Sequence, residues 1–210
     1  MLKIAVIDGA HPYDVPGWHR LFRSMEGIEY YPQSLDNWVW DWGQCRAIYD
    51  VALFYNFHFD LPADPEDATR KSIQWLGTTQ QGIVVLHHAI LAWPGEKIWS
   101  DITGIADRAF EYHVDQTYTV QVTAPDHPIV SGLQPWNMQD ETYTMQEPDE
   151  NCEQLLTTEH PRSMKSIAWT RTYGRSRVFC FQAGHDQIAW SSGHFREVLR
   201  RGILWAAGRL

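Results

Sequence analysis

The stretch GIVVLHHAI, residues 82–90, begins as a continuous apolar run and then reaches two adjacent histidines. Continuous rather than alternating hydrophobicity is typical of a strand covered on both faces, as in a parallel sheet between helices. In such a sheet, ligands bind outside the carboxyl ends of the strands. His87 and His88 therefore stand where this class of fold places its functional sites.

The same pattern of apolar strand and amphipathic helix recurs along the chain. We predict strands at Leu2–Asp8, Ile28–Tyr31, Val51–Tyr55, Gly82–Leu86 and Val178–Phe181, and helices at Gly17–Met25, Pro65–Gln81 and Ser192–Gly208. Between about residues 112 and 169, the alternating stretch QTYTVQVT and closely spaced turn signals indicate added antiparallel strands. We expect a single α/β domain over residues 1–210, with three layers and a mainly parallel sheet flanked by helices.

Composition excludes several classes of function. The 210 residues carry a net charge of -9, with 17 Lys and Arg against 26 Asp and Glu, and this balance disfavours nucleic acid as a partner. The first apolar stretch, in MLKIAVIDGA, is too short for a secretion signal or a membrane span, so we expect a cytoplasmic protein with no membrane partner. Three cysteines without a CxxC spacing suit a reducing compartment and argue against a thiolate metal site.

Histidines follow four of the predicted strands. His11 follows the first strand and His58 the third, while His87 and His185 follow two later ones. Because the carboxyl ends of parallel strands meet at one edge of a sheet, we expect these side chains to share a cleft. A single histidine at a strand end is more often a structural residue, but several together favour a site.

Four motifs, in order along the chain, resemble those of the ThuA-like, or trehalose-utilisation, family: GIVVLHHA, DHPIVSGL, DETYTM and YGRSRVFCFQAGHDQIAW. The resemblance covers nearly the whole chain and implies a flavodoxin-like fold similar to class I glutamine amidotransferases. It also implies that His87 matches the family's histidine at the turn after the strand. Glu141, Tyr143 and His185 match its DE-x-Y and GH-D elements, whereas His88 falls at a variable position.

The comparison with amidotransferases predicts a different chemistry for this chain. Those enzymes place a nucleophilic cysteine at the strand-to-helix turn and activate it with a histidine. Here His87 occupies that turn, and no cysteine lies at another plausible one. We therefore do not expect glutamine hydrolysis.

We predict that His87, His185 and Glu141 are the catalytic residues. Imidazoles beside a carboxylate can relay protons, or they can bind a divalent metal such as zinc, with His87 and His185 as candidate ligands. The sequence has no HExxH or other closely spaced metal motif, so the metal hypothesis is the less favoured of the two. We expect a substrate-binding set at His11, His58, Trp93, Tyr143, Asp186 and Trp190.

The tryptophans suggest the kind of ligand. Trp93 and Trp190 each follow one of the site histidines, where they could wall a pocket and contact the C–H faces of a sugar. The stretch WVWDW, residues 38–42, fits either a stacking surface or an edge strand. His127, in DHPIVSGL, is expected to hydrogen-bond its own turn.

Two functions from different classes remain open. The first is an enzyme of carbohydrate utilisation that acts on a sugar or keto-sugar by acid-base or metal-assisted chemistry. The second is a non-catalytic small-molecule-binding or regulatory module on the same fold, because a fold alone does not carry function. In both cases the expected partner is a sugar-like small molecule, and self-association into a homo-oligomer is left open.

Overall fold

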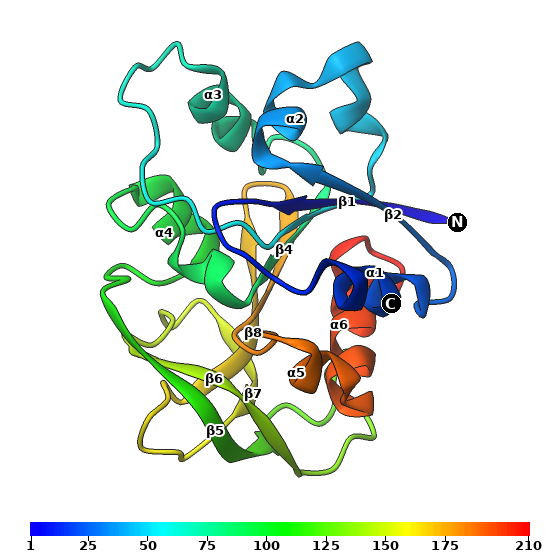
Figure 1. The fold of residues 1–210 in the computed structure, drawn as a ribbon, viewed down its shortest axis with the longest axis vertical. Helices are drawn as coiled ribbons and strands as arrows, with labels where there is room; N and C mark the ends of the chain where they lie inside the picture. Colours follow the sequence, from blue (N-terminus) through cyan, green and yellow to red (C-terminus); the bar gives the residue numbers. More distant parts are fainter.

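A computed structural model describes residues 1–210. The chain forms one nine-stranded sheet with helices on both faces (Figure 1). The strand order is β2-β1-β3-β4-β9-β8-β7-β5-β6. The strands are β1 (Leu2–Asp8), β2 (Ile28–Ser34), β3 (Val51–Phe54), β4 (Gly82–Leu86), β5 (Phe110–Val122), β6 (Trp136–Met145), β7 (Glu153–Thr157), β8 (Ser166–Tyr173) and β9 (Ser176–Phe181).

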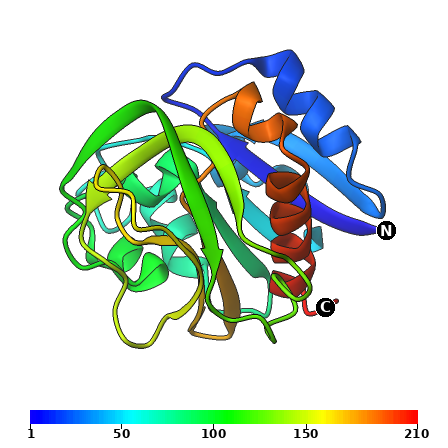
Figure 2. The same ribbon diagram turned by 90° about the horizontal axis from the view of Figure 1, so that it is seen from below.

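The sheet is mixed, and our prediction of a mainly parallel sheet is wrong. The pairings from β2 to β9 are parallel, and those from β9 to β6 are antiparallel. The longest ladder is the antiparallel one between β5 and β6, which form a long curved pair along one side of the molecule (Figure 2). We predicted the antiparallel strands as an addition, but they make up half of the pairings.

Helices cover both faces of the sheet and complete three layers. They are α1 (Val15–Arg23), α2 (Leu35–Trp40), α3 (Ala68–Trp75), α4 (Lys97–Thr103), α5 (Gln187–Ser191) and α6 (Gly193–Ala206), with 3₁₀ segments η1 (Trp42–Ile48) and η2 (His87–Leu91). One hydrophobic core joins α1, α5 and α6 to the sheet, and the second joins α2, α3 and α4 to its other face. No helix combines the length and the hydropathy that crossing a bilayer requires.

Several elements form where the sequence predicts them, with capping residues at their ends. Asp14 accepts a hydrogen bond from the backbone of Gly17 at the start of α1, and Ser192 caps α6 in the same way. The edge position of β2 tolerates Pro32, which has no N–H to donate. Gly202 of α6 lies so close to the ring of Phe179 on β9 that a methyl group there would overlap it. This glycine therefore allows α6 to pack tightly on the sheet.

Two local predictions differ from the structure. The helix predicted at Pro65–Gln81 is shorter, because the chain leaves α3 at Leu76 and Gly77 then adopts a left-handed conformation with φ of 80°. WVWDW is not an edge strand, because α2 runs through Trp40 and the chain then turns. Trp38 points into the core, whereas Trp40 and Trp42 are exposed. A period of two in the sequence was therefore misleading here.

Candidate functional site

The turn after β4 carries His87 in an unusual backbone conformation. Its φ is 53°, in the left-handed region that costs a residue with a side chain about 1–2 kcal/mol. β4 ends at Leu86 and the 3₁₀ segment η2 begins at His87, so His87 occupies a sharp turn from strand to helix. Strained backbone of this kind persists where the surrounding structure imposes it, and it concentrates at functional sites.

The ring of His87 is fully buried, and both of its nitrogens have polar contacts. Nδ1 lies 2.8 Å from the carbonyl oxygen of Gln182, which can only accept, so Nδ1 carries a proton. The hydroxyl of Tyr143 lies 2.8 Å from Nε2. Burial, together with the charge of Glu141, raises the pKa of Tyr143 well above its ordinary value, so this hydroxyl stays protonated.

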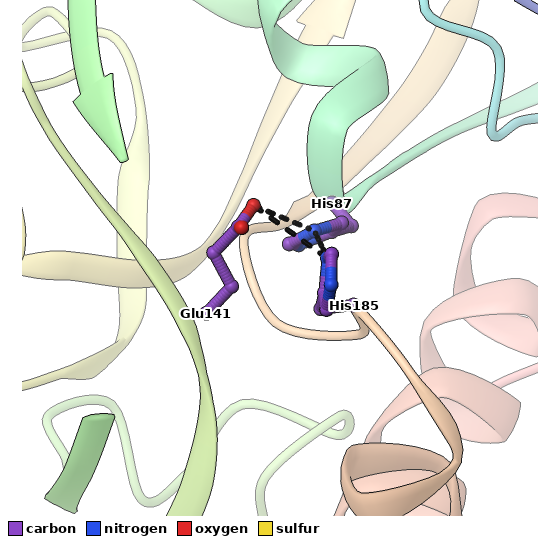
Figure 3. Close-up of side chains that lie close together, drawn as sticks. All are labelled: His87, Glu141 and His185. Atoms are coloured by element: carbon purple, nitrogen blue, oxygen red, sulfur yellow. Dashed lines mark hydrogen bonds and ion pairs between the residues drawn. The ribbon is translucent and has the colours of Figure 1, made fainter. Parts of the chain in front are cut away.

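Glu141 and His185 meet His87 at the same nitrogen (Figure 3). Oε1 of Glu141 lies 3.5 Å from Nε2 of His87 and 3.6 Å from Nδ1 of His185, and the two ring nitrogens are 3.3 Å apart. Glu141 and Tyr143 reach His87 together because they are two residues apart on β6 and share a face. We call His87, Glu141 and His185 the central cluster.

The cluster also determines the ionisation of Glu141. Burial favours the neutral acid, but the hydrogen bond with His87 and the charges of His87 and His185 outweigh burial and hold the pKa of Glu141 below its ordinary value. The carboxylate is therefore ionised at neutral pH. Its side chain is 10% exposed and that of His185 is 31% exposed, whereas that of His87 is not exposed at all. A ligand would contact Glu141 and His185, with His87 behind them.

A buried carboxylate that the sequence analysis missed holds the loop of His185. The side chain of Asp140 accepts backbone N–H bonds from Gly184 at 2.6 Å and His185 at 3.0 Å. Gly184 has a φ of 123°, which a residue with a side chain rarely adopts. On the other side of the loop, the indole N–H of Trp190 donates to the Gly184 carbonyl at 2.8 Å. Glu141 and its neighbour thus play different parts, one in the site and one in its support.

Two cavities meet at Glu141. The first, of about 270 Å³, is polar, and we call it the acidic cavity: it is lined by Val114, Asp115, Gln139, Asp140, Glu141, His185, Asp186 and Ile188. The second, of about 400 Å³, we call the aromatic cavity: it is lined by His11, Phe57, Phe59, His88, Leu91, Phe110, Tyr112, Glu141 and Tyr143. The aromatic cavity is within the range of about 300–1,000 Å³ that is usual for small-molecule sites, and the acidic cavity is slightly smaller.

The residues predicted to bind substrate are only partly brought to these cavities. His11 and Tyr143 line the aromatic cavity, and Asp186 lines the acidic one while capping α5. His58, Trp93 and Trp190 line neither. Trp93 is fully buried in the core and Trp190 supports the His185 loop, contrary to the expectation that both wall a pocket.

Phenylalanine and tyrosine, rather than tryptophan, form the aromatic wall. Phe57 and Phe59 flank His58 in the segment after β3, and Phe110 and Tyr112 alternate along β5. Both pairs have the spacing of two that places side chains on one face of extended chain, which is the signal that could have identified them. His127 behaves as predicted: its ring accepts a hydrogen bond from the backbone of Ile129 at 3.2 Å.

The fold and the central cluster define an α/β protein with a histidine at the strand-to-helix turn. The family model for ThuA, described as trehalose utilisation, matches residues 47–206, and the chain belongs to this family. No curated protein is similar enough in sequence to count as a relative.

Solved structures share the fold at low sequence identity. A protein from Parabacteroides merdae described as ThuA-like is 19% identical, with a TM-score of 0.73, covering 98% of this chain and 90% of its own. A cytoplasmic protein of Salmonella typhimurium is 11% identical, with a TM-score of 0.69 and coverage of 98% and 99%. A Thermoplasma acidophilum protein described as part of a GMP synthase is 14% identical, with a TM-score of 0.59 and coverage of 99% and 95%.

Proposed function

We propose that this chain is an enzyme of carbohydrate utilisation that acts on a sugar or keto-sugar, with the central cluster as its reactive centre. The observation that carries this proposal is the convergence of Glu141, His185 and His87 at one nitrogen, beside two cavities of small-molecule size. Membership of a family described by trehalose utilisation supports a carbohydrate substrate.

The geometry suits proton transfer. Glu141 is the ionised group nearest to both cavities, so it acts as the base that accepts a proton from the substrate. His185, the most exposed member of the cluster, exchanges protons with the substrate on the other side. His87 is buried, so it contacts Glu141 and His185 rather than the substrate. The hydroxyl of Tyr143 holds the His87 ring in place.

A metal ion would fit the same three side chains. Zinc held tetrahedrally at about 2.0 to 2.1 Å separates its ligand atoms by about 3.4 Å, and the three separations in the cluster run from 3.3 to 3.6 Å. The Nδ1 bond of His87 to a backbone carbonyl is the kind of outer contact that orients metal-binding histidines. A bound zinc ion would supply a Lewis acid or an activated water.

Glutamine hydrolysis does not suit this site. None of the three cysteines stands at the turn after β4. Cys45 is exposed on η1, Cys152 lies between β6 and β7, and Cys180 is buried within β9. An imidazole at that turn is a poor acyl acceptor compared with a thiolate. The expected cytoplasmic location, the exclusion of nucleic acid and membrane partners, and self-association remain predictions.

The proposal is tested by a thermal-shift and turnover screen of sugars and keto-sugars, with metal analysis of the same preparation. We expect at least one compound to raise the melting temperature and to be converted by the parent protein. Glu141→Gln should lower turnover by about 10²-fold or more, since it removes the base but keeps the shape. Glu153→Gln, an exposed glutamate on β7, is the matched control and should behave as the parent.

Two results would contradict this function. If no sugar or keto-sugar binds or reacts, the substrate class is wrong. If a sugar binds and is recovered unchanged from the parent protein, the chain is a binding module rather than an enzyme. Metal content separates the two chemical routes: a stoichiometric metal that is lost in His185→Gln supports metal-assisted chemistry, and full activity after chelation supports proton transfer alone.

A further inference from the structure

We propose that the aromatic cavity is a subsite for an uncharged apolar group attached to the sugar, so that the substrate is a glycoside with an aromatic or alkyl aglycone. The inference rests on the proposed function in placing the reacting bond at Glu141. It adds which part of the substrate lies in which cavity. The glycosyl part would occupy the acidic cavity, and the aglycone would extend past Glu141 and Tyr143.

The walls of the aromatic cavity are built for apolar contact. Six of its nine lining residues are hydrophobic, and they come from both halves of the sheet. Phe57, from the segment after β3, lies 6.3 Å from Phe110 of β5 between ring centroids, in a T-shaped arrangement. Phe110 in turn lies 5.8 Å from Tyr143 of β6. These rings form a continuous aromatic wall that ends at the reactive centre.

The rim of this cavity leaves aromatic surface in contact with water. Phe59 is 52% exposed and Tyr112 is 64% exposed, and they stand on separate segments of the chain. Exposed aromatic side chains that line the same concave site are typical of a place that a ligand covers. Tyr112 pairs across the ladder with Tyr143, which fixes the distance from the rim to the cluster.

Charge divides the two cavities. Apart from Glu141, where they meet, the aromatic cavity has no carboxylate, lysine or arginine in its lining, and the ring of His88 there is tied to the Tyr55 carbonyl at 2.8 Å. The acidic cavity offers carboxylate and amide groups that can accept hydrogen bonds from hydroxyls. An anionic aglycone would lose its hydration in the aromatic cavity and would lie near the Glu141 carboxylate, which has the same charge. The subsite therefore selects against anionic groups, and its apolar walls favour uncharged ones.

A bulge in β5 shapes the boundary between the cavities. The register of β5 and β6 shifts between His113 and Gln116, and Asp115 adopts a φ of 55°. Bulges of this kind redirect side chains and are frequent beside functional sites. Here the strand supplies Phe110 and Tyr112 to one cavity before the bulge, and Val114 and Asp115 to the other.

The test compares phenyl glycosides with their methyl counterparts as ligands. Affinities for phenyl α- and β-glucoside, methyl α- and β-glucoside and benzyl alcohol are measured by calorimetry on the full chain. We expect a phenyl glucoside to bind at least about 10-fold more tightly than its methyl counterpart. Tyr112→Ala, at a largely exposed position that leaves folding intact, should abolish most of this gain. Trp42→Ala, an exposed aromatic on η1 outside both cavities, should leave it unchanged.

The outcomes separate this inference from the proposed function. Equal affinity of phenyl and methyl glucosides, or a gain that Tyr112→Ala does not reduce, would overturn the subsite while Glu141-dependent turnover of sugars still stands. Benzyl alcohol that binds and depends on Tyr112, in a protein that neither binds nor converts any sugar, would support the subsite and contradict the function. If neither glucosides nor benzyl alcohol bind, the subsite is wrong, and the proposed function falls with it only if the screen of sugars and keto-sugars finds no ligand either.

Discussion

At the scale of single residues, the two adjacent histidines have separate functions. His87 turns its ring toward Glu141 and His185, whereas His88 is held by the Tyr55 carbonyl and faces His11 at 4.4 Å between ring centroids. From the sequence, only the family resemblance assigned the site role to His87 rather than to His88. Hydrophobic periodicity does not distinguish two neighbouring histidines that follow the same strand. The left-handed conformation of His87 makes the difference, because it turns successive side chains in unrelated directions.

His88 gives the first prediction, which concerns acid stability. Burial, with smaller effects from the charges of His87 and His11, lowers the pKa of His88 to about 2 in the folded protein. In the unfolded chain its pKa is near the ordinary value of about 6.5, so below that pH only the unfolded chain takes up the proton. The free energy of unfolding should therefore fall by up to about 1.4 kcal/mol for each pH unit, from about pH 6.5 downward.

The measurement is urea unfolding at pH 7, 6, 5 and 4. The His88→Gln variant should lose this contribution, so its stability should decline less steeply with acid than that of the parent. It should also be less stable at pH 7, because a buried hydrogen bond is disturbed, at a cost of about 1–3 kcal/mol. His160→Gln, outside the cluster, serves as control. Parallel pH curves for the parent and His88→Gln would show that His88 takes up its proton in the folded state too.

At the scale of elements, the site depends on the loop between β9 and α5. The loop carries His185, and its backbone is fixed by the Asp140 carboxylate on one side and by Trp190 on the other. Burial raises the pKa of Asp140 above its ordinary value, although three backbone N–H donors favour its carboxylate form. The neighbouring residues Asp140 and Glu141 point to opposite faces of β6, so one strand both supports the loop and supplies the reactive carboxylate.

We predict that Asp140→Asn loosens this loop. The amide can accept fewer of the three N–H bonds, so unfolding free energy should drop by about 1–3 kcal/mol. Hydrogen exchange at the Gly184 and His185 amides should accelerate more than exchange in the strands. Asp126→Asn, at an exposed position in the turn after β5, is the matched control. If both amides stay equally protected from hydrogen exchange in Asp140→Asn, the loop does not depend on the Asp140 carboxylate for its conformation.

The sequence predicts elements better than it predicts what they contact. Hydrophobic periodicity identified β1, β4 and α6 correctly. The burial of a strand or of one helix face requires apolar residues at regular spacing, and that spacing can be seen within a short stretch of sequence. The support of His185 by Asp140 joins residues 45 positions apart, and no local pattern encodes it. The tryptophans were misplaced for a related reason: a large aromatic side chain fits a core and a pocket equally well, and only packing decides.

At the scale of the whole molecule, β9 joins two halves of different construction. It pairs in parallel with β4 on one side and antiparallel with β8 on the other. The rule that strand ends converge at one edge was sufficient to bring His87 and His185 together, since both follow parallel strands. The position of Glu141 could not follow from that rule, because β6 lies at the far end of the strand order and reaches the cluster by curving.

We predict that the two halves unfold together. The core under α1, α5 and α6 extends along the whole sheet, the core on the other face reaches from β1 to β8, and the site itself is built from residues of both halves. Far-ultraviolet and near-ultraviolet circular dichroism should therefore give coincident urea transitions. The expectation of a single domain over residues 1–210 would be contradicted by two separated transitions, with the antiparallel half melting on its own.

The central claim is that Glu141 and His185, the two members of the central cluster that a ligand would contact, act as one unit, and a double-mutant cycle on turnover tests it most directly. The measured quantity is kcat/KM for the sugar or keto-sugar that the parent protein converts, in Glu141→Gln, His185→Gln and the double variant. Groups that act together are lost together, so each single change should cost about 10²-fold or more and the double change no more than the worse single one. Losses that multiply, or a single variant that keeps full activity, would show that the side chains meet in the structure without sharing a reaction.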